Sequence, residues 1–188
     1  MIDFDATDRS RRVEDEYFRR RDAEILHRAR EVERVAHERT ALAEALGALD
    51  PDAVDQLHAC GLRVSTAALV EWLPAVEVAW LDGADEAERH ALRVHFNVDN
   101  RANTEGMALL DGWLTARPPE ELFIAGRRAI KARLHALGAD EREALTARVL
   151  ALCEATGRAA GGYFGVGSLS SDERRQITVI QGDLERPV

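Results

Sequence analysis

The sequence has little cysteine and few aromatic residues, and each shortage narrows the possible folds. Two cysteines in 188 residues cannot form a disulfide framework. We expect Cys60 and Cys153 to be buried free thiols, as is usual in a reducing compartment. Aromatic residues make up 5% of a chain that is 46% hydrophobic. The core must therefore consist mainly of Leu, Val and Ala, a composition that favours helices over sheets.

Long apolar runs are also missing, and acidic residues outnumber basic ones. No stretch approaches the ~20 apolar residues that a membrane helix needs, and no apolar leader region stands at the N-terminus. We therefore expect a cytoplasmic protein without a transmembrane segment. The net charge is −9, which would repel a phosphate backbone and argues against nucleic acid as a partner. It is compatible with cations or with a basic protein.

No segment shows the period-two alternation of a half-buried strand. Apolar residues recur at spacings of three and four almost throughout, and the connections between these segments are short. The pattern predicts an all-α helical bundle of about seven or eight helices.

The first of these helices is long and amphipathic. Residues 10–46 contain neither Gly nor Pro, and apolar residues repeat every seven positions in two companion rows, Phe18, Ile25, Val32 and Ala29, Ala36, Ala43. Such a stripe fits three arrangements: an arm packed along its own domain, a coiled-coil arm that pairs with another protomer, or a solvated helix. We divide the chain into this helix, residues 1–48, and a helical domain, residues 49–188. The candidate partner-binding residues are Phe18, Ile25, Ala29 and Val32.

The chain is organised around an acidic turn in residues 75–89. Asp82-Gly83 supplies the turn, and the spacing of Asp85 and Glu88 is that of a capping box, in which each side chain accepts a hydrogen bond from the other residue's N–H. Ser170 and Glu173 repeat the spacing near the C-terminus, which suggests two copies of one helix–turn–helix unit. A third box is predicted at Asp140 and Glu143.

The acidic residues of this turn are also a candidate site for a divalent cation, because hard cations prefer carboxylate oxygens. The loop lacks the ligand series of an EF-hand, and helix capping alone accounts for Asp85 and Glu88. Both interpretations stay open. The candidate metal ligands are Glu77, Asp82, Asp85 and Glu88.

The Gly-rich connector at residues 161–167 interrupts the helical pattern. It lacks the lysine of a phosphate-binding loop and follows no strand, so tight packing at a helix end is the simpler interpretation. A small-molecule pocket lined by Tyr163 and Phe164 is the alternative. No di-iron, zinc-protease or hydrolase motif occurs, and we predict a non-enzymatic protein.

The segment Val76-Glu77-Val78-Ala79-Trp80-Leu81-Asp82-Gly83, with Glu88-Arg89 after it, resembles the signature of TerB-like tellurite-resistance proteins. Residues 161–167 with Ser170 and Glu173 are similar to the second half of that pattern. The resemblance implies an all-helical fold of two related halves, here with an added N-terminal helix. It also implies a link to tellurite and stress responses, and metal-binding acidic residues in the turns. By position, Asp82 matches the signature Asp, and Glu88 and Glu173 match the two helix-start Glu residues.

These observations lead to a first hypothesis and two alternatives. The first is a cytoplasmic TerB-like module that binds a partner, has the acidic turn as its candidate site for a divalent cation, and self-associates through its N-terminal helix. The second is a small-molecule binder or enzyme with its pocket near residues 161–167. The third is a structural subunit docked onto a larger assembly through the same helix.

Overall fold

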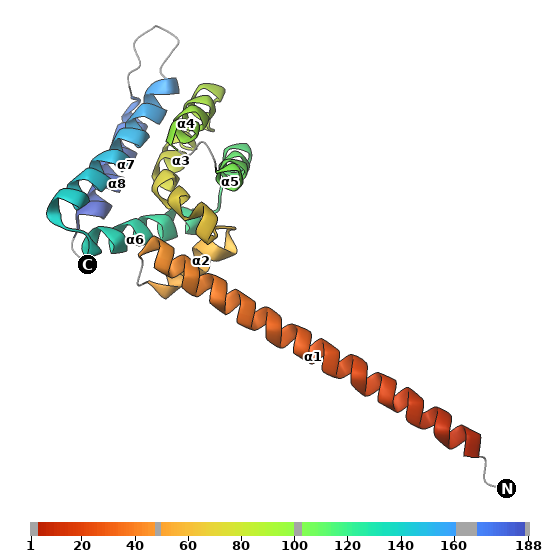
Figure 1. Cartoon of the computed structure of the whole chain (residues 1–188). Helices are drawn as coiled ribbons and strands as arrows, with labels where there is room; N and C mark the ends of the chain where they lie inside the picture. The colour runs from red at the N-terminus through yellow and green to blue at the C-terminus, as the bar shows by residue number, and fades with distance from the viewer. Residues whose placement is uncertain (1–3, 48–49, 100–102, 161–168, 187–188) are drawn as a thin grey trace. The chain divides into compact units, whose positions relative to one another are not determined.

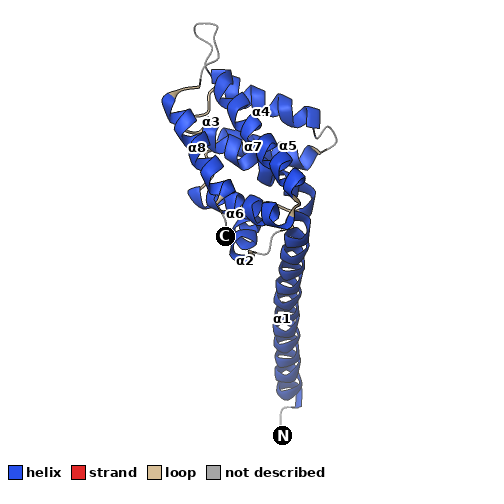
Figure 2. Cartoon of the chain, turned by 90° about the vertical axis from the view of Figure 1, so that its left-hand side faces the viewer, coloured by secondary structure: helices blue, strands red, loops and turns tan. Residues whose placement is uncertain are grey.

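The computed structural model describes residues 4–47, 50–99, 103–160 and 169–186, and within these ranges every regular element is a helix (Figures 1 and 2). This confirms the prediction of an all-α protein. The described part contains eight α-helices and one 3₁₀ helix: α1 (Phe4–Leu46), α2 (Pro51–Ala59), η1 (Val64–Trp72), α3 (Leu73–Ala79), α4 (Glu86–Asp99), α5 (Thr104–Thr115), α6 (Glu120–Ala136), α7 (Ala139–Ala160) and α8 (Ser171–Glu185). None of these helices is long and apolar enough to cross a membrane.

The chain divides into two compact units, residues 1–38 and residues 39–188. The division falls inside α1, ahead of the boundary at residue 48 that the sequence pattern suggests. The last two turns of α1 belong to the second unit, because the side chains of Leu42 and Leu46 are buried in its core.

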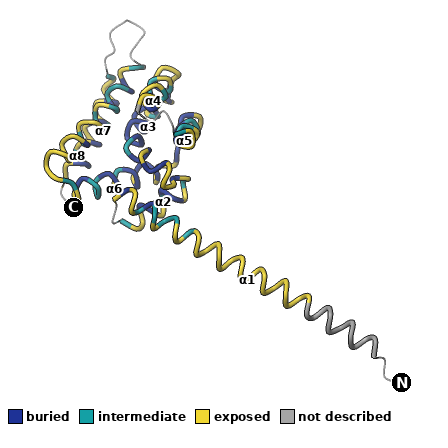
Figure 3. The backbone as a smooth tube through the Cα atoms, in the orientation of Figure 1, coloured by how far each residue is buried: buried dark blue, intermediate teal, exposed yellow. Residues whose placement is uncertain are grey.

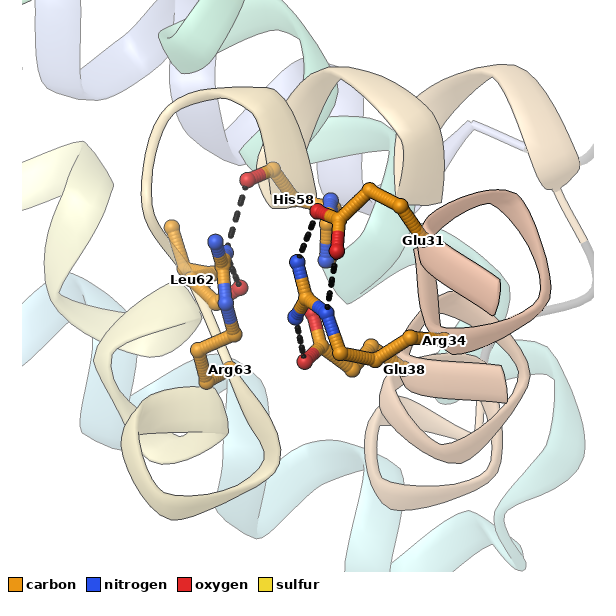
Figure 4. Close-up of polar contacts among 6 residues, drawn as sticks. All are labelled: Glu31, Arg34, Glu38, His58, Leu62 and Arg63. Atoms are coloured by element: carbon orange, nitrogen blue, oxygen red, sulfur yellow. Dashed lines mark hydrogen bonds and ion pairs between the residues drawn. The ribbon is translucent and has the colours of Figure 1, made fainter. Parts of the chain in front are cut away.

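The first unit consists of α1 residues whose described side chains are mostly exposed (Figure 3). Glutamate–arginine pairs at spacings of three and four run along the helix, as in Arg20–Glu16 and Arg28–Glu24 (both 2.6 Å). Arg34 lies between Glu31 and Glu38 and pairs with both (Figure 4). Pairs at these spacings each contribute about 0.2–0.5 kcal/mol to an isolated helix, and so support α1 along its solvated length.

The second unit is a bundle around α3. Every residue of α3 is buried, and α7 packs against α3, α4 and α8, while α6 packs against α2, α3 and α8. Gly126 allows α6 to approach α3 closely, since a Cβ atom there would lie 2.6 Å from Leu73 Cδ1. Pro74 lies in the first turn of α3, where its missing N–H costs nothing. The helix type changes just before this proline, since η1 ends at Trp72 and α3 begins at Leu73.

Local side-chain contacts close the first connections of the bundle. Asp50 caps α2 by accepting a hydrogen bond from the Ala53 N–H, and Pro51 follows it in the first turn. Arg63 donates from one guanidinium nitrogen to the carbonyl oxygens of His58 and Leu62, at 2.8 and 2.7 Å (Figure 4). The His58 carbonyl also accepts from the Gly61 N–H (3.1 Å), so Arg63 adds a second donor there and supplies one to Leu62 in the connection that follows α2.

Two sequence predictions are corrected in detail. The third capping box is wrong: α7 begins at Ala139, and Glu141, not Glu143, accepts the bond from the Gly138 N–H (3.4 Å). Both thiols are free, but only Cys153 is buried, while Cys60 is half-buried. Burial raises the pKa of Cys153 to about 12, so this thiol stays protonated.

Candidate functional site

The predicted acidic turn joins α3 to α4 through two left-handed residues. Gly83 has φ = +117° and Ala84 has φ = +51°. The Ala84 N–H donates to the carbonyl oxygen of Ala79 (2.6 Å), which closes the end of α3. Ala84 is a non-glycine residue in this conformation and is almost completely buried. The turn is therefore a packed part of the fold, and it fixes where α4 begins.

Trp80 anchors the same turn to α5. Its indole N–H donates to the carbonyl oxygen of Trp113 at 2.8 Å. The Arg89 guanidinium lies over the indole ring, 5.7 Å from its centre. The start of α4 is thus held from both sides, by α3 through the chain and by α5 through Trp80.

The predicted capping box at the start of α4 is present. The Asp85 N–H donates to Glu88 Oε2, and the Glu88 N–H donates to Asp85 Oδ1, both at 2.9 Å. The echo at the start of α8 is present too. The Ser170 N–H donates to Glu173 Oε2 (2.5 Å), and the Glu173 N–H donates to Ser170 Oγ (3.2 Å). Both helix starts therefore hold a glutamate in the same capping role.

Capping uses only one oxygen of each glutamate. The side chain of Glu88 is 0% exposed and that of Glu173 is 4% exposed. In both, Oε1 is buried and has no hydrogen-bond partner among the described residues. A buried carboxylate oxygen without a partner is costly, and native proteins rarely keep one without a role.

The charge of Glu173 acts on Glu88. Burial raises the pKa of Glu88 to about 7, against the hydrogen bond from the Asp85 backbone, and the charges of Asp82, Asp85 and Glu173 raise it further. Near neutral pH this carboxyl group is therefore poised between its neutral and charged forms. A cation beside it would favour the charged form and would supply the missing contact to Oε1.

Gly157 of α7 makes room for this arrangement. A Cβ atom at that position would lie 2.6 Å from Leu169 Cδ2 and 2.9 Å from Glu173 Oε1. Only glycine allows α7 to approach the capping glutamate of α8 this closely. The sequence signal is a single glycine inside an otherwise helical segment, which is more often a packing requirement than a turn.

Glu77 does not belong to this group. It is buried in α3, where it pairs with Arg127 of α6 and accepts a hydrogen bond from Gln176 of α8 (2.8 Å). Burial raises the pKa of Glu77, and the hydrogen bond and charge of Arg127 act in the opposite direction. Both oxygens of this carboxylate are used in joining three helices, so Glu77 holds the bundle together.

The four predicted metal ligands are therefore only partly brought together. Asp82 and Asp85 lie exposed beside buried Glu88, and Glu173 joins them from α8, whereas Glu77 is engaged elsewhere. Within the described ranges, no three His, Cys, Asp or Glu side chains are arranged to hold a metal ion between them. Cation binding at this turn stays a prediction.

A separate cleft of about 710 Å³ lies between η1, α4 and α7. Its lining is apolar around Trp72, with three ionisable side chains among the residues Ala68, Glu71, Trp72, His95, Arg148, Val149, Ala151, Leu152 and Ala155. Glu71 is held by two arginines, with Arg133 at 2.6 Å and Arg148 at 2.6 Å. Arg148 lines the cleft, whereas Arg133 does not.

The sequence did not indicate this cleft, because its walls come from three distant segments. The pocket expected near Tyr163 and Phe164 falls on residues that lie outside the described ranges.

Comparison with protein-family models, with curated proteins and with solved structures found no match to this chain. The resemblance to TerB-like proteins and the two related halves therefore stay predictions. The paired capping glutamates and the cleft must be interpreted from their own chemistry.

Proposed function

We propose that this protein is a non-enzymatic, TerB-like binding module whose site is the pair of buried capping glutamates, Glu88 and Glu173. The observation that carries the proposal is the buried, unpartnered Oε1 atom of each. In this proposal a divalent cation takes these two oxygens as ligands, with Asp82 at the exposed edge. The link to tellurite or stress responses rests on the sequence resemblance alone.

The chemistry of the donors selects the class of cation. Carboxylate oxygens without thiolate or imidazole ligands suit Mg²⁺ or Ca²⁺ better than Zn²⁺. Mg²⁺ in particular is often held by only one or two carboxylates and keeps several waters. The two buried glutamates fit that pattern, and Asp82 adds negative charge nearby without serving as a third ligand. Binding would link the start of α4 to the start of α8. A partner that contacts these helix ends would then bind differently with and without the cation.

Calorimetric titration tests the proposal. MgCl₂, CaCl₂ and ZnCl₂ are titrated separately into the full chain at pH 8, where Glu88 is mostly charged. We expect saturable binding of Mg²⁺ or Ca²⁺, lost in Glu88→Gln and weakened in Asp82→Ala. Glu86→Gln is the matched control. Glu86 is the same residue type two positions before Glu88, but its side chain is exposed. No heat above the buffer blank, or equal binding in all four proteins, would remove the cation site.

The cleft supports a second candidate function, the binding of a small apolar anion. Its apolar wall at Trp72 and Leu152, with the half-exposed Arg148 guanidinium in the lining, favours a ligand with a carboxylate and a hydrocarbon body. Decanoate titration followed by tryptophan fluorescence tests this. We expect a saturable change that is lost when Ala151→Trp fills the cleft and retained in Ala144→Trp on the same helix. A response that does not saturate, or that both variants keep, would argue against it.

A further inference from the structure

The exposed part of α1 carries a continuous apolar face. Phe18, Ile25 and Val32 are 58%, 55% and 71% exposed, and Tyr17 and Leu26 beside them are exposed by more than half. Single exposed apolar residues are ordinary, but five on four and a half turns of one helix form a contiguous surface. The i,i+3 and i,i+4 ion pairs stabilise the helix without covering this face.

The spacing along this face is that of a coiled-coil seam. Steps of three and four alternate along the row Asp22, Ile25, Ala29, Val32, Ala36 and Arg39. Large residues occupy one position of the heptad and alanines the other. A charged residue of opposite sign stands at each end of the row.

Two copies of this row are complementary only when the two helices run in opposite directions. In a parallel pair each residue meets its own copy, so Asp22 would face Asp22, Arg39 would face Arg39, and Ala29 would leave a gap against Ala29. In an antiparallel pair the two heptad positions face each other. With the symmetry axis between Ala29 and Val32, every large residue meets an alanine: Ile25 faces Ala36 of the second copy, and Ala29 faces Val32. Asp22 then faces Arg39 of the second copy.

We propose that α1 pairs with α1 of a second copy of this chain as an antiparallel coiled coil, centred between Ala29 and Val32. The size match keeps the two helices at one close separation along the four apolar layers. Arg39 contacts Asp55 of its own chain at 3.3 Å, and its side chain is still 42% exposed. The exposed Asp22–Arg39 pair therefore adds little affinity and mainly selects the antiparallel direction.

A second copy explains features that an unrelated partner would not require. A groove on another protein needs apolar side chains, but it does not need their sizes and charges to repeat in reverse about one point. Such reversal is the signature of an isologous, two-fold interface. The pairing does not depend on the proposed cation site, since it uses none of its residues.

The first test is the oligomeric state of the full chain by sedimentation velocity over a range of concentrations. We expect a concentration-dependent dimer of the 20.8 kDa chain. Ala29→Glu places a charge in the seam and should shift dissociation to at least tenfold higher concentration. Ala23→Glu is the matched control, because it makes the same change on the opposite, outer side of the helix. A monomer at every concentration, as expected if α1 folds back onto its own chain, overturns the proposal, and so does equal weakening by both variants.

Disulfide trapping tests the direction and the register. In the antiparallel pair, position 25 of one copy lies beside position 36 of the other, while the two copies of position 25 lie roughly 16 Å apart along the axis, too far for a disulfide. We therefore expect the double variant Ile25→Cys, Ala36→Cys to form covalent dimers on mild oxidation. Each single variant should form no more covalent dimer than the wild type, whose own level measures the contribution of the native thiols. Covalent dimers of the single variants indicate a parallel pair and contradict the proposal. A dimer that no variant traps contradicts the register.

Discussion

A carboxylate without accessible surface is costly to ionise, and at the scale of single residues this cost should dominate the pH dependence of stability. The folded protein holds a proton on Glu88 up to a pKa of about 7, whereas an ordinary glutamate releases it near 4.5. Between these values the folded state binds more protons than the unfolded state. The contribution of Glu88 to the free energy of unfolding is therefore fully present below about pH 4.5 and is lost as the pH rises through 7. The shift corresponds to a loss on the order of 3 kcal/mol.

Glu88→Gln should remove most of this loss. Glutamine keeps an oxygen that can accept the capping bond from Asp85 but never becomes charged. We expect the variant to be about 1–3 kcal/mol more stable than the wild type at pH 8 with EDTA present, and to show no such gain at pH 4.5. Urea unfolding across this pH range is the measurement. The exposed control Glu86→Gln should follow the wild-type curve, and a parallel curve for Glu88→Gln would show that Glu88 titrates normally.

Gly157 should be intolerant of even one added carbon. Ala at this position brings a methyl group against Leu169 and against the carboxylate of Glu173, and α7 or the α8 cap must shift. We expect Gly157→Ala to lower the free energy of unfolding by about 1–3 kcal/mol. Gly182→Ala in α8 is the control, because a Cβ atom there meets nothing within 4 Å. Alanine at that helical site should instead raise stability by up to about 1 kcal/mol, and equal effects of the two changes would contradict the proposed packing.

At the scale of whole elements, Arg127 should matter more than its neighbour in α6. Arg127 is 15% exposed, and it pairs with buried Glu77 and lies 3.5 Å from Asp183. Its removal leaves a buried charge with only Gln176 as a partner, so Arg127→Ala should cost about 3 kcal/mol. Arg128 pairs with Asp50 but is 43% exposed, so Arg128→Ala should cost less than about 1 kcal/mol. Chemical denaturation of both variants compares the two costs directly.

The elements that could be predicted from sequence are those decided by neighbouring residues. The boxes at Asp85–Glu88 and Ser170–Glu173 depend on a spacing of three residues. The box at Asp140–Glu143 failed for a local reason as well. Gly138 is an acceptable N-cap, and Glu141 lies three residues after it, so the helix starts two residues earlier.

The assembled site depends on contacts that no local pattern encodes. Glu77 was predicted with the acidic turn because it is near in sequence, but its partners Arg127 and Gln176 are 50 and 99 residues away. The association of Glu88 with Glu173 requires α4 and α8 to pack on the same helix, α7. The cleft likewise needs η1, α4 and α7 together. The sequence therefore indicated the capping glutamates one at a time, and only the packing of the bundle relates them.

At the scale of the whole molecule, the question is where the folded body begins. The heptad pattern suggests a boundary at residue 48, after α1, but the buried side chains of Leu42 and Leu46 belong to the core of the second unit. A fragment of residues 39–188 should therefore keep the stability of the full chain. A fragment of residues 49–188 loses both leucines and should be about 3–6 kcal/mol less stable.

Urea unfolding of the two fragments and the full chain, at one low protein concentration, measures this difference. Low concentration matters because pairing through α1 would add stability to the full chain alone. Adding Leu42→Ala and Leu46→Ala to the fragment of residues 39–188 should reproduce most of the loss, since the truncation acts through those two side chains rather than through chain length. If the fragment of residues 49–188 were as stable as the fragment of residues 39–188, the last turns of α1 would be dispensable. The body would then begin where the sequence pattern places it.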